Sequence, residues 1–312
     1  MTLDVLATGY PSFDYILPVS HSPGLGETAL LEKVPDDNGA SFGGCGCNVA
    51  TGLARLGFQA GIAMILGDDY VGALYRSRLR EQHIDDRDII VMPRAQTSRS
   101  YLFLNRDGEY QNFFFAGASD QWQGSLRLRN VPGSKYALVT VGPYHYNKQF
   151  FQLAWESGTP TIWQLKPDIF AYPAEAMSDF ASKSKYILMN RIEYAYVSKS
   201  MGLQNPEELL SDMTQAVVIT RGAEGSQVYS VDGTITVAAV KLDKIVDVTG
   251  AGDAFAAGFL AGVLKDWNLQ ISARIGAVMA SFVLQQLGCQ TNLPSWKQME
   301  TRYNENFEPL PQ

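Results

Sequence analysis

The run from Asp247 to Phe259 reads DVTGAGDAFAAGF, and it places glycines beside a carboxylate. Phe255 and Phe259 recur at helical spacing, so the glycines lie at the start of a predicted helix. Backbone amides point outward there without partners and carry the positive end of the helix dipole, and glycines let an anion approach them closely. The run therefore predicts an anion site.

Asp253 falls in the first turn of that helix, where the dipole favours the ionised carboxylate. The carboxylate can accept the proton of a hydroxyl group as that oxygen attacks a phosphoryl group, while the amides hold the charge that builds on the phosphoryl group. Taken alone, a Gly-x-Gly-Asp sequence more often caps or charge-balances a helix. The chain contains no Gly-Lys dipeptide and no His-Arg-Asp sequence, which excludes Walker A proteins and protein kinases.

Two polar residues near the N-terminus can grip hydroxyl groups. Asp14 follows the first predicted strand, and Asn48 comes after the Gly43-Gly44 pair that opens a helix. Both places lie at the carboxyl ends of parallel strands, where α/β sheets bind ligands. A carboxylate and a carboxamide there can hold adjacent hydroxyls, although Asp14 alone is more often a turn residue.

Two later strand ends suit a nucleotide. Asn190 ends a strand, and Asn190 with Glu193 can hold water around a magnesium ion carried by ATP, because that ion prefers to keep its waters. Alone, the two residues fit a helix start. The strand ending at Thr220 runs into RGAEG, whose small residues can pass beside nucleotide phosphates. A plain turn is the alternative for this second segment.

The elements that must position these residues predict a doubly wound α/β fold with a mostly parallel sheet. From about residue 119, short apolar runs alternate with helical patterns. A helix from about Gly46 to Leu56 ends at Gly57, a plausible C-cap. The predicted strands are LATGY near the start, Phe58 to Leu66, Tyr136 to Gly142, Pro160 to Leu165, Lys185 to Asn190 and Ala216 to Thr220.

Two stretches interrupt this pattern and predict a small β-sheet lid. Residues 101 to 115 alternate about an Asp107-Gly108 turn, which is a strong hairpin signal. Residues 11 to 41 lack a helical period and contain several prolines, among them Pro35. A surface hairpin is the alternative to a lid, and a second hairpin is predicted over Gln227 to Val240. The predicted large nucleotide-binding catalytic domain comprises residues 1–10, 42–95 and 119–312, and the lid comprises residues 11–41 and 96–118.

Composition limits the classes of partner. The formal charge is −7, from 25 Lys and Arg against 32 Asp and Glu, and no basic run can follow a nucleic-acid backbone. The first residues do not resemble a signal peptide, and no apolar stretch of about 18 residues suggests a membrane span. Cys45, Cys47 and Cys289 indicate neither a disulfide framework nor a zinc site. We expect a cytoplasmic protein that binds small molecules.

Together these segments resemble the ribokinase-like (PfkB) family of carbohydrate and nucleoside kinases over nearly the whole chain. GGCGCNVATGLARLG resembles its N-terminal signature, NRIE its Asn-x-x-Glu motif, TRGAEG its nucleotide loop and DVTGAGDAFAAGF its C-terminal signature. The resemblance implies transfer of the γ-phosphoryl group of ATP, with Mg²⁺, to a hydroxyl group. It implies that Asp253 is the general base and that Gly250, Ala251 and Gly252 form the anion hole.

The same resemblance implies the remaining site residues. The acceptor contacts are Asp14, Gly43, Gly44 and Asn48, and the residues that serve ATP and its magnesium are Asn190, Glu193, Thr220, Gly222 and Gly225. Asp247 and Thr249 fall where many members bind a potassium ion (K⁺) beside the anion hole.

Other segments resemble the archaeal-type nucleoside kinases, among them SFDYI, LMNRIEY and ASFVLQQLGCQTNLPSW. We therefore favour a nucleoside 5′-hydroxyl as acceptor. Phe103, Phe113 or Phe115 of the hairpin can stack on a base, or they form the core of the lid itself. After the strand TIWQL, many sugar kinases of the family carry Asp, whereas this chain has Gln164 followed by Lys166.

Three functions are open from the sequence. A nucleoside kinase and a sugar kinase that phosphorylates a hydroxymethyl group share the signatures. A binding or regulatory protein that lost turnover is the third, but such a protein has no need of the base Asp253. The sequence also leaves open a homodimer formed through the lid edges.

Overall fold

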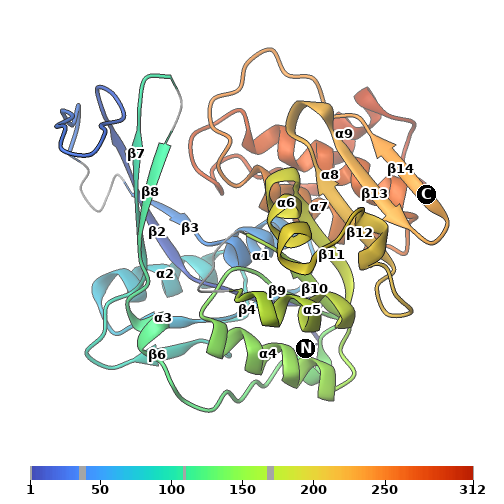
Figure 1. Cartoon of the computed structure of the whole chain (residues 1–312), viewed down its shortest axis with the longest axis horizontal. Coiled ribbons are helices and arrows are strands. Elements are labelled where there is room, and N and C mark those ends of the chain that lie inside the picture. The colour runs from blue at the N-terminus through green and yellow to red at the C-terminus, as the bar shows by residue number, and fades with distance from the viewer. Residues whose placement is uncertain (1, 35–39, 108–109, 167–171, 312) are drawn as a thin grey trace.

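The computed structural model describes residues 2–34, 40–107, 110–166 and 172–311 of the 312-residue chain. Within these residues, eight strands form one large sheet (Figure 1). In spatial order its strands are β14 (Gly233–Val237), β13 (Ser226–Ser230), β12 (Ala216–Thr220), β11 (Ser184–Asn190), β10 (Thr161–Gln164), β9 (Tyr136–Val139), β1 (Val5–Thr8) and β4 (Ala60–Ala63). Pairing is parallel from β4 to β12, and β13 runs antiparallel to both β12 and β14.

The parallel strands of the large sheet are mostly apolar because helices cover both of its faces. In β12, Val217 and Ile219 belong to one hydrophobic core, and Val218 belongs to the other. One face is covered by α1 (Cys45–Arg55), α7 (Ala251–Leu264), α8 (Leu269–Val283) and α9 (Trp296–Asn306), and the other by α4 (Tyr144–Glu156), α5 (Ala174–Lys183) and α6 (Arg191–Met201). The predicted doubly wound α/β fold is confirmed.

Helix α7 is buried from Asp253 to Val263 because other helices pack on its sides. Glycines permit this close packing. A Cβ atom on Gly258 would lie 2.7 Å from the carbonyl oxygen of Ile275 in α8, and one on Gly52 in α1 would lie 2.7 Å from the Cβ of Ala257. The packing fixes the position of the glycine-rich start of α7.

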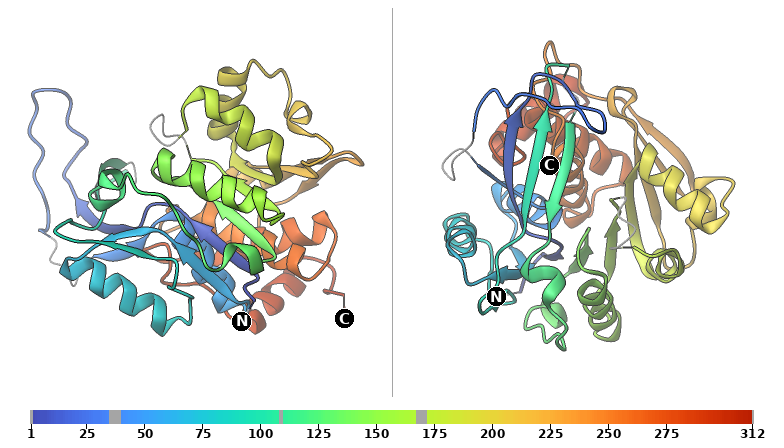
Figure 2. Two further views of the ribbon diagram at one scale, coloured as in Figure 1. Left: turned by 90° about the horizontal axis from the view of Figure 1, so that it is seen from below. Right: turned by 60° about the vertical axis from the view of Figure 1, so that its left-hand side comes forward.

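A second sheet of four strands stands beside the large one (Figures 1 and 2). Its order is β3 (Ser41–Gly43), β2 (Ser12–Pro18), β7 (Arg99–Leu104) and β8 (Tyr110–Phe115). β7 and β8 pair antiparallel, as the predicted hairpin requires, and Arg99 lies opposite Phe115. Phe13, Tyr15 and Leu17 of β2 form the core of this sheet. The predicted small β-sheet lid is confirmed.

The boundaries that we predict for the lid, residues 11–41 and 96–118, stay a prediction. β3 crosses the boundary between residues 41 and 42. The lid was predicted partly from Pro35 and Gly108, and both residues lie outside the described part of the chain.

The predicted strand from Phe58 to Leu66 is wrong in one respect. The structure divides it into β4 of the large sheet and β5 (Ile65–Gly67), which pairs in parallel with β6 (Ile90–Met92). The break falls at Met64, whose carbonyl oxygen accepts a hydrogen bond from the Ile90 amide at 2.9 Å. Apolar residues continue through the break, so periodicity could not reveal it.

The remaining described elements are α2 (Tyr70–Glu81), α3 (Ala118–Gln121) and the short 3-10 helices η2 (Val131–Gly133), η3 (Pro206–Leu209) and η4 (Gly222–Glu224).

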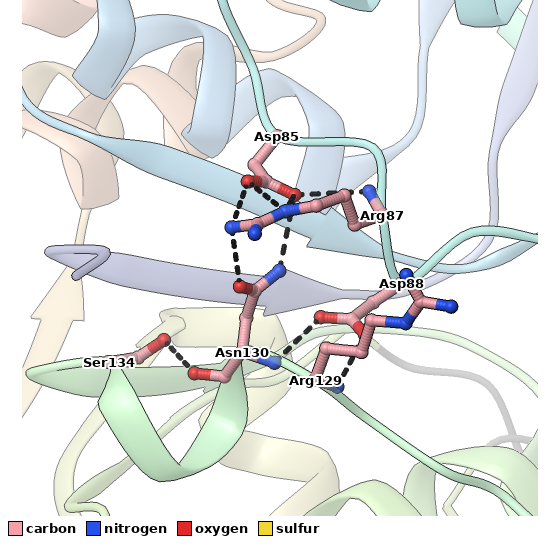
Figure 3. A network of polar contacts seen from close by, with 6 residues as sticks. All are labelled: Asp85, Arg87, Asp88, Arg129, Asn130 and Ser134. Atoms are coloured by element: carbon pink, nitrogen blue, oxygen red, sulfur yellow. Dashed lines mark hydrogen bonds and ion pairs between the residues drawn. The ribbon is translucent and has the colours of Figure 1, made fainter. Parts of the chain in front are cut away.

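A polar network joins two connections at the amino ends of β4 and β9 (Figure 3). The Asp88 carboxylate accepts hydrogen bonds from the Arg129 amide at 2.6 Å and the Asn130 amide at 3.1 Å. The side chain of Asn130 bridges to Asp85 and Arg87, which form an ion pair at 2.6 Å. Burial alone would raise the pKa of Asp85, but hydrogen bonds from Arg87 lower it below its ordinary value. The network therefore stabilises the edge of the sheet opposite to the predicted site.

Among the described residues, no helix combines the length and apolarity needed to span a bilayer.

Candidate active site

The first turn of α7 has the features of the predicted anion hole. Gly250 is the N-cap residue and adopts the left-handed conformation, with φ of 77°, and a Cβ there would collide with Cys289. Within the described part of the chain, the amides of Gly252 and Asp253 have no hydrogen-bond acceptor. No atom lies within 4 Å of the place that a Cβ on Gly252 would take. An anion can therefore approach these amides.

Asp253 lies at this helix start with both carboxylate oxygens held by amides. Its Oδ2 accepts a hydrogen bond from Nδ2 of Asn48 at 2.8 Å, and its Oδ1 accepts one from Nε2 of Gln164 at 2.7 Å. The residue is 7% exposed. Burial raises the pKa of Asp253, and the Asn48 hydrogen bond, the charge of Lys166 and the Gln164 hydrogen bond oppose that rise. Donors on both oxygens favour the carboxylate form that a general base requires.

A further amide fixes the orientation of Asn48. Nε2 of Gln290 donates a hydrogen bond to Oδ1 of Asn48 at 2.9 Å. Because its oxygen is thus engaged, Asn48 must present its NH₂ group to Asp253. In the sequence, Gln164 stands out as a departure from the family pattern, and Gln290 carries no signal. Neither residue has a spacing that reveals its contact, since the contact depends on how distant segments pack.

Asp14 lies in β2 and is 7% exposed. Its Oδ1 accepts a hydrogen bond from the Ser12 hydroxyl, whose oxygen lies 2.9 Å from that of Ser100. Burial raises the pKa of Asp14, and the Ser12 hydrogen bond opposes the rise. Gly43 leaves room for this carboxylate, because a Cβ on Gly43 would overlap it.

These residues surround one cavity of about 220 Å³ between the large sheet and the lid. Asp14, Asn48, Thr249, Gly250 and Asp253 line it among the predicted site residues, and Gly44 does so at the start of α1. Gly43, Ala251 and Gly252 are outside that lining. Residues that the sequence analysis did not assign also line the cavity, among them Tyr10, Ser12, Cys45, Ser100, Leu102, Asn112, Phe114, Lys166 and Cys289.

The lid presents a different phenylalanine from those that we predicted. Asn112 and Phe114 of β8 line the cavity. Since side chains alternate along a strand, Phe113 lies on the opposite face, where its ring packs edge to face on Phe103 with centroids 5.5 Å apart. Phe103 packs on the core of the lid, and Phe115 is likewise outside the cavity lining. Because three phenylalanines follow one another, the sequence did not show which of them faces the cavity.

Asn190 and Glu193 form a capping box at the start of α6. Oδ1 of Asn190 accepts hydrogen bonds from the amides of Ile192 at 2.8 Å and Glu193 at 2.9 Å, and Oε2 of Glu193 accepts one from the Asn190 amide at 2.6 Å. Burial raises the pKa of Glu193 to about 7. The helix-start interpretation is thus correct, and a role toward magnesium remains a prediction.

The other predicted nucleotide residues lie at a neighbouring strand end. Thr220 is paired with Asn190 across β11 and β12. Gly222 and Gly225 have φ of 59° and 88°, and a Cβ on Gly225 would collide with the carbonyl of Val237. These glycines are therefore needed for the turn itself. The turn lies at the same carboxyl edge of the sheet as Gln164 and Asn190.

Asp247 fixes the loop before α7. Its Oδ1 accepts a hydrogen bond from the Thr249 amide at 2.9 Å, and its Oδ2 accepts one from the Gly288 amide at 2.9 Å. These bonds connect the loop before the anion hole to the segment that follows α8. These hydrogen bonds do not test whether Asp247 and Thr249 adjoin a potassium ion, so that statement stays a prediction. Among the described residues, no group of three or more His, Cys, Asp or Glu side chains is arranged to hold a metal ion.

Comparisons with known proteins show the family of the chain. The pfkB family carbohydrate kinase model matches residues 16–296. A nucleoside kinase of Methanocaldococcus jannaschii is 26% identical over 298 residues, with 96% of each chain covered. A 5-dehydro-2-deoxygluconokinase of Bacillus subtilis is 24% identical over 325 residues, which cover 95% of this chain and 94% of that protein.

A solved structure shows the same fold. The nucleoside kinase of Burkholderia thailandensis in complex with inosine superimposes with a TM-score of 0.86 at 22% sequence identity, covering 99% of this chain and 98% of that one. The family model spans most of the 312 residues and includes both the lid strands β7 and β8 and the start of α7. The chain therefore belongs to the pfkB family of carbohydrate kinases, and it is a phosphotransferase that acts on a hydroxyl group.

Proposed function

We propose that this protein transfers the γ-phosphoryl group of ATP to the 5′-hydroxyl of a nucleoside. Asp253 is the general base, and the amides of Gly250, Ala251 and Gly252 form the anion hole. Support comes from the buried carboxylate, from its two amide donors and from the Gly252 amide, which has no acceptor among the described residues. The acceptor hydroxyl gives its proton to Asp253 while the helix start stabilises the charge that develops on the phosphoryl group.

The lid face that borders the cavity favours a nucleoside over a bare sugar, and it is the observation that carries this proposal. Phe114 and Asn112 line the same cavity as Asp14, Asn48 and Asp253. An aromatic ring can stack on a base, and a carboxamide can donate to and accept from the polar edge of a base. Asp14 and Asn48 are the groups that we assign to the sugar hydroxyls. The likeness to nucleoside kinases agrees with this choice.

The nucleotide lies, in this proposal, along the strand ends that carry Thr220 and Asn190, with Gly222 and Gly225 beside its phosphates. Glu193 supplies a carboxylate beside Asn190 for magnesium, and a nearby cation would favour the ionised form against the burial that raises its pKa to about 7. Magnesium retains several waters when it is bound with nucleotide phosphates, and Glu193 would contact one of them. The bound ion would supply charge neutralisation on the phosphates. Asp247 and Thr249 are proposed neighbours of a potassium ion.

A panel of nucleosides and sugars with ATP and magnesium tests the acceptor class. We expect nucleosides to be phosphorylated with a higher kcat/KM than ribose or fructose. Phe114→Ala should raise the KM for nucleosides by about 5- to 150-fold, since stacking on an aromatic ring contributes about 1–3 kcal/mol per base. Phe113→Ala is the matched control, because Phe113 lies on the opposite face of the same strand and is 59% exposed.

A sugar kinase is the second candidate, because sugar-acid and fructose kinases are also among the relatives. Efficient turnover of a sugar with no turnover of any nucleoside would establish that function and reject the nucleoside proposal. In that case Phe114→Ala and Phe113→Ala should affect the preferred substrate to a similar small extent.

A further inference from the structure

Within the described part of the chain, two carboxylates and one lysine line the cavity. Asp14 and Asp253 line it, and the Glu193 carboxylate is close enough to Asp253 for their charges to interact. Among the described residues, Lys166 is the single Lys or Arg side chain of the lining. A phosphoryl group that enters this site meets like charge from the carboxylates, so a cation is needed to offset the repulsion.

Lys166 follows β10, in the middle of the parallel sheet. It stands two residues after Gln164, whose amide holds the base Asp253. The neighbouring strand β11 carries Asn190 and leads into Glu193. Lys166 thus lies at the strand edge between the proposed acceptor groups and the proposed nucleotide groups, and its side chain is exposed to the cavity.

We propose that Lys166 is a catalytic residue whose ammonium group contacts the phosphoryl group as it passes from the nucleotide to the acceptor. A lysine acts here as a mobile point charge, which suits a group that moves during the reaction. The anion hole stabilises the phosphoryl group from the start of α7, and Lys166 does so from the end of β10. This inference rests on the proposed role of Asp253 and extends the proposed function by one residue.

The effect of Lys166 on the pKa values of nearby carboxylates agrees with this position. Its charge lowers the pKa of Asp14, Asp253 and Glu193, in each case against the larger effect of burial. One cation therefore acts on the proposed acceptor contact, on the base and on the proposed magnesium contact. A nucleoside has no charge that would require a cation. The negative charge of the phosphoryl group, by contrast, is most exposed while that group passes from the nucleotide to the acceptor.

Binding of a phosphoryl mimic and kinetics together test the proposal in the full-length protein. The first probe is Mg-ADP with aluminium fluoride, which imitates the transferred group, and the second is Mg-ADP alone. Lys166→Met should reduce kcat by about 10²- to 10³-fold, the usual effect of losing one donor to transition-state charge. It should also weaken binding of the aluminium fluoride complex by at least tenfold, with affinity for Mg-ADP alone and the nucleoside KM changed by less than about threefold. Lys166→Arg should recover part of kcat, and Lys297→Met on α9 is a control at an exposed lysine.

Other outcomes overturn the proposal. Unchanged kcat and unchanged binding of the aluminium fluoride complex in Lys166→Met would show that Lys166 does not contact the phosphoryl group. A rise in acceptor KM with kcat retained would make it an acceptor contact instead. Failure of the nucleoside proposal is distinguishable, because the aluminium fluoride measurement requires no acceptor. A protein that phosphorylates only sugars can still lose this binding when Lys166 is replaced.

Discussion

At the scale of single residues, neutral amides orient the proposed base Asp253. Gln164 and Asn48 donate to the two oxygens of Asp253, and Gln290 fixes Asn48 in the donating orientation. Neutral donors hold the carboxylate without pairing it with a charge in direct contact. Its basicity is therefore not lost to a salt bridge, and burial raises its pKa although the two amide donors oppose the rise.

Replacement of the base tests that role. Asp253→Asn should lower kcat by about 10²- to 10⁴-fold, the range expected for a positioned general base, and should leave the affinity for Mg-ADP nearly unchanged. Steady-state kinetics and calorimetric titration measure the two quantities. Asp243→Asn, at an exposed aspartate of the preceding loop, is the control. Comparable turnover of Asp253→Asn and the wild type would reject Asp253 as the base.

Glu193 makes folding stability depend on pH. Its folded-state pKa of about 7 lies above its ordinary value of 4.5, so the folded state binds the proton more tightly than the unfolded state. The resulting stabilisation is present below about pH 4.5 and is lost as the pH rises through about 7. Between pH 5 and pH 8, Glu193→Gln should therefore gain about 1–3 kcal/mol in unfolding free energy relative to the wild type.

Urea titrations without nucleotide or magnesium measure this difference. The glutamine side chain keeps an oxygen that can accept the Asn190 amide, so the capping box need not be lost. Parallel pH profiles of the two proteins would contradict the assignment of a raised pKa to Glu193.

At the scale of elements, helix packing fixes the anion hole and strand alternation fixes the acceptor side. Helix α7 approaches α8 through glycines, and the place of a Cβ on Gly258 is already occupied by backbone of α8. In β8, alternation turns Asn112 and Phe114 toward the cavity and Phe113 away from it. The two elements thus bring different halves of the site together.

A larger side chain between α7 and α8 should separate the helices. We expect Gly258→Val to lower the unfolding free energy by about 1–3 kcal/mol, the usual cost of overpacking a core. Gly133→Val is the matched control, because no atom lies within 4 Å of the place of its Cβ. Urea unfolding of both variants checks the prediction. An equal effect of the two substitutions would show that the close approach of the helices is unimportant for stability.

At the scale of the whole molecule, the site lies between the large domain and the lid sheet. Helix α7, which packs on the large sheet, supplies the proposed base and anion hole, and the lid sheet supplies Asp14, Ser100 and Phe114. Figure 2 shows the lid as a layer beside the large sheet. A movement of one sheet toward the other would exclude water from the transferred phosphoryl group, which protects ATP from hydrolysis.

We predict that the lid closes when acceptor and nucleotide are both bound. Amide hydrogen exchange in β2, β7 and β8 should slow by at least several-fold with inosine and Mg-ADP present, relative to the free protein. Exchange in α9, on the far side of the large domain, should change little and serves as the internal reference. Unchanged exchange of the lid strands at saturating ligand would argue against closure.

The sequence by itself determined the fold class and the lid, and it predicted the chemistry of the α7 start. Apolar runs that alternate with helical periods determine a doubly wound sheet, and glycines before a helix with an early carboxylate predict an anion site beside a base. These features are local, so they depend only on residues close together in the chain. The strand break at Met64, through which apolar residues continue, and the three consecutive phenylalanines mark the limit of such local signals.

The tertiary structure alone decided which distant side chains meet. Gln290, Asn48, Gln164 and Asp253 come from four separate segments, and their hydrogen bonds exist only because α1, α7 and β10 converge at one edge of the sheet. The same convergence places Lys166 in the cavity and turns Phe114, not its neighbours, toward it. Contacts between segments so far apart depend on the packing of both hydrophobic cores, and no spacing within the chain encodes them.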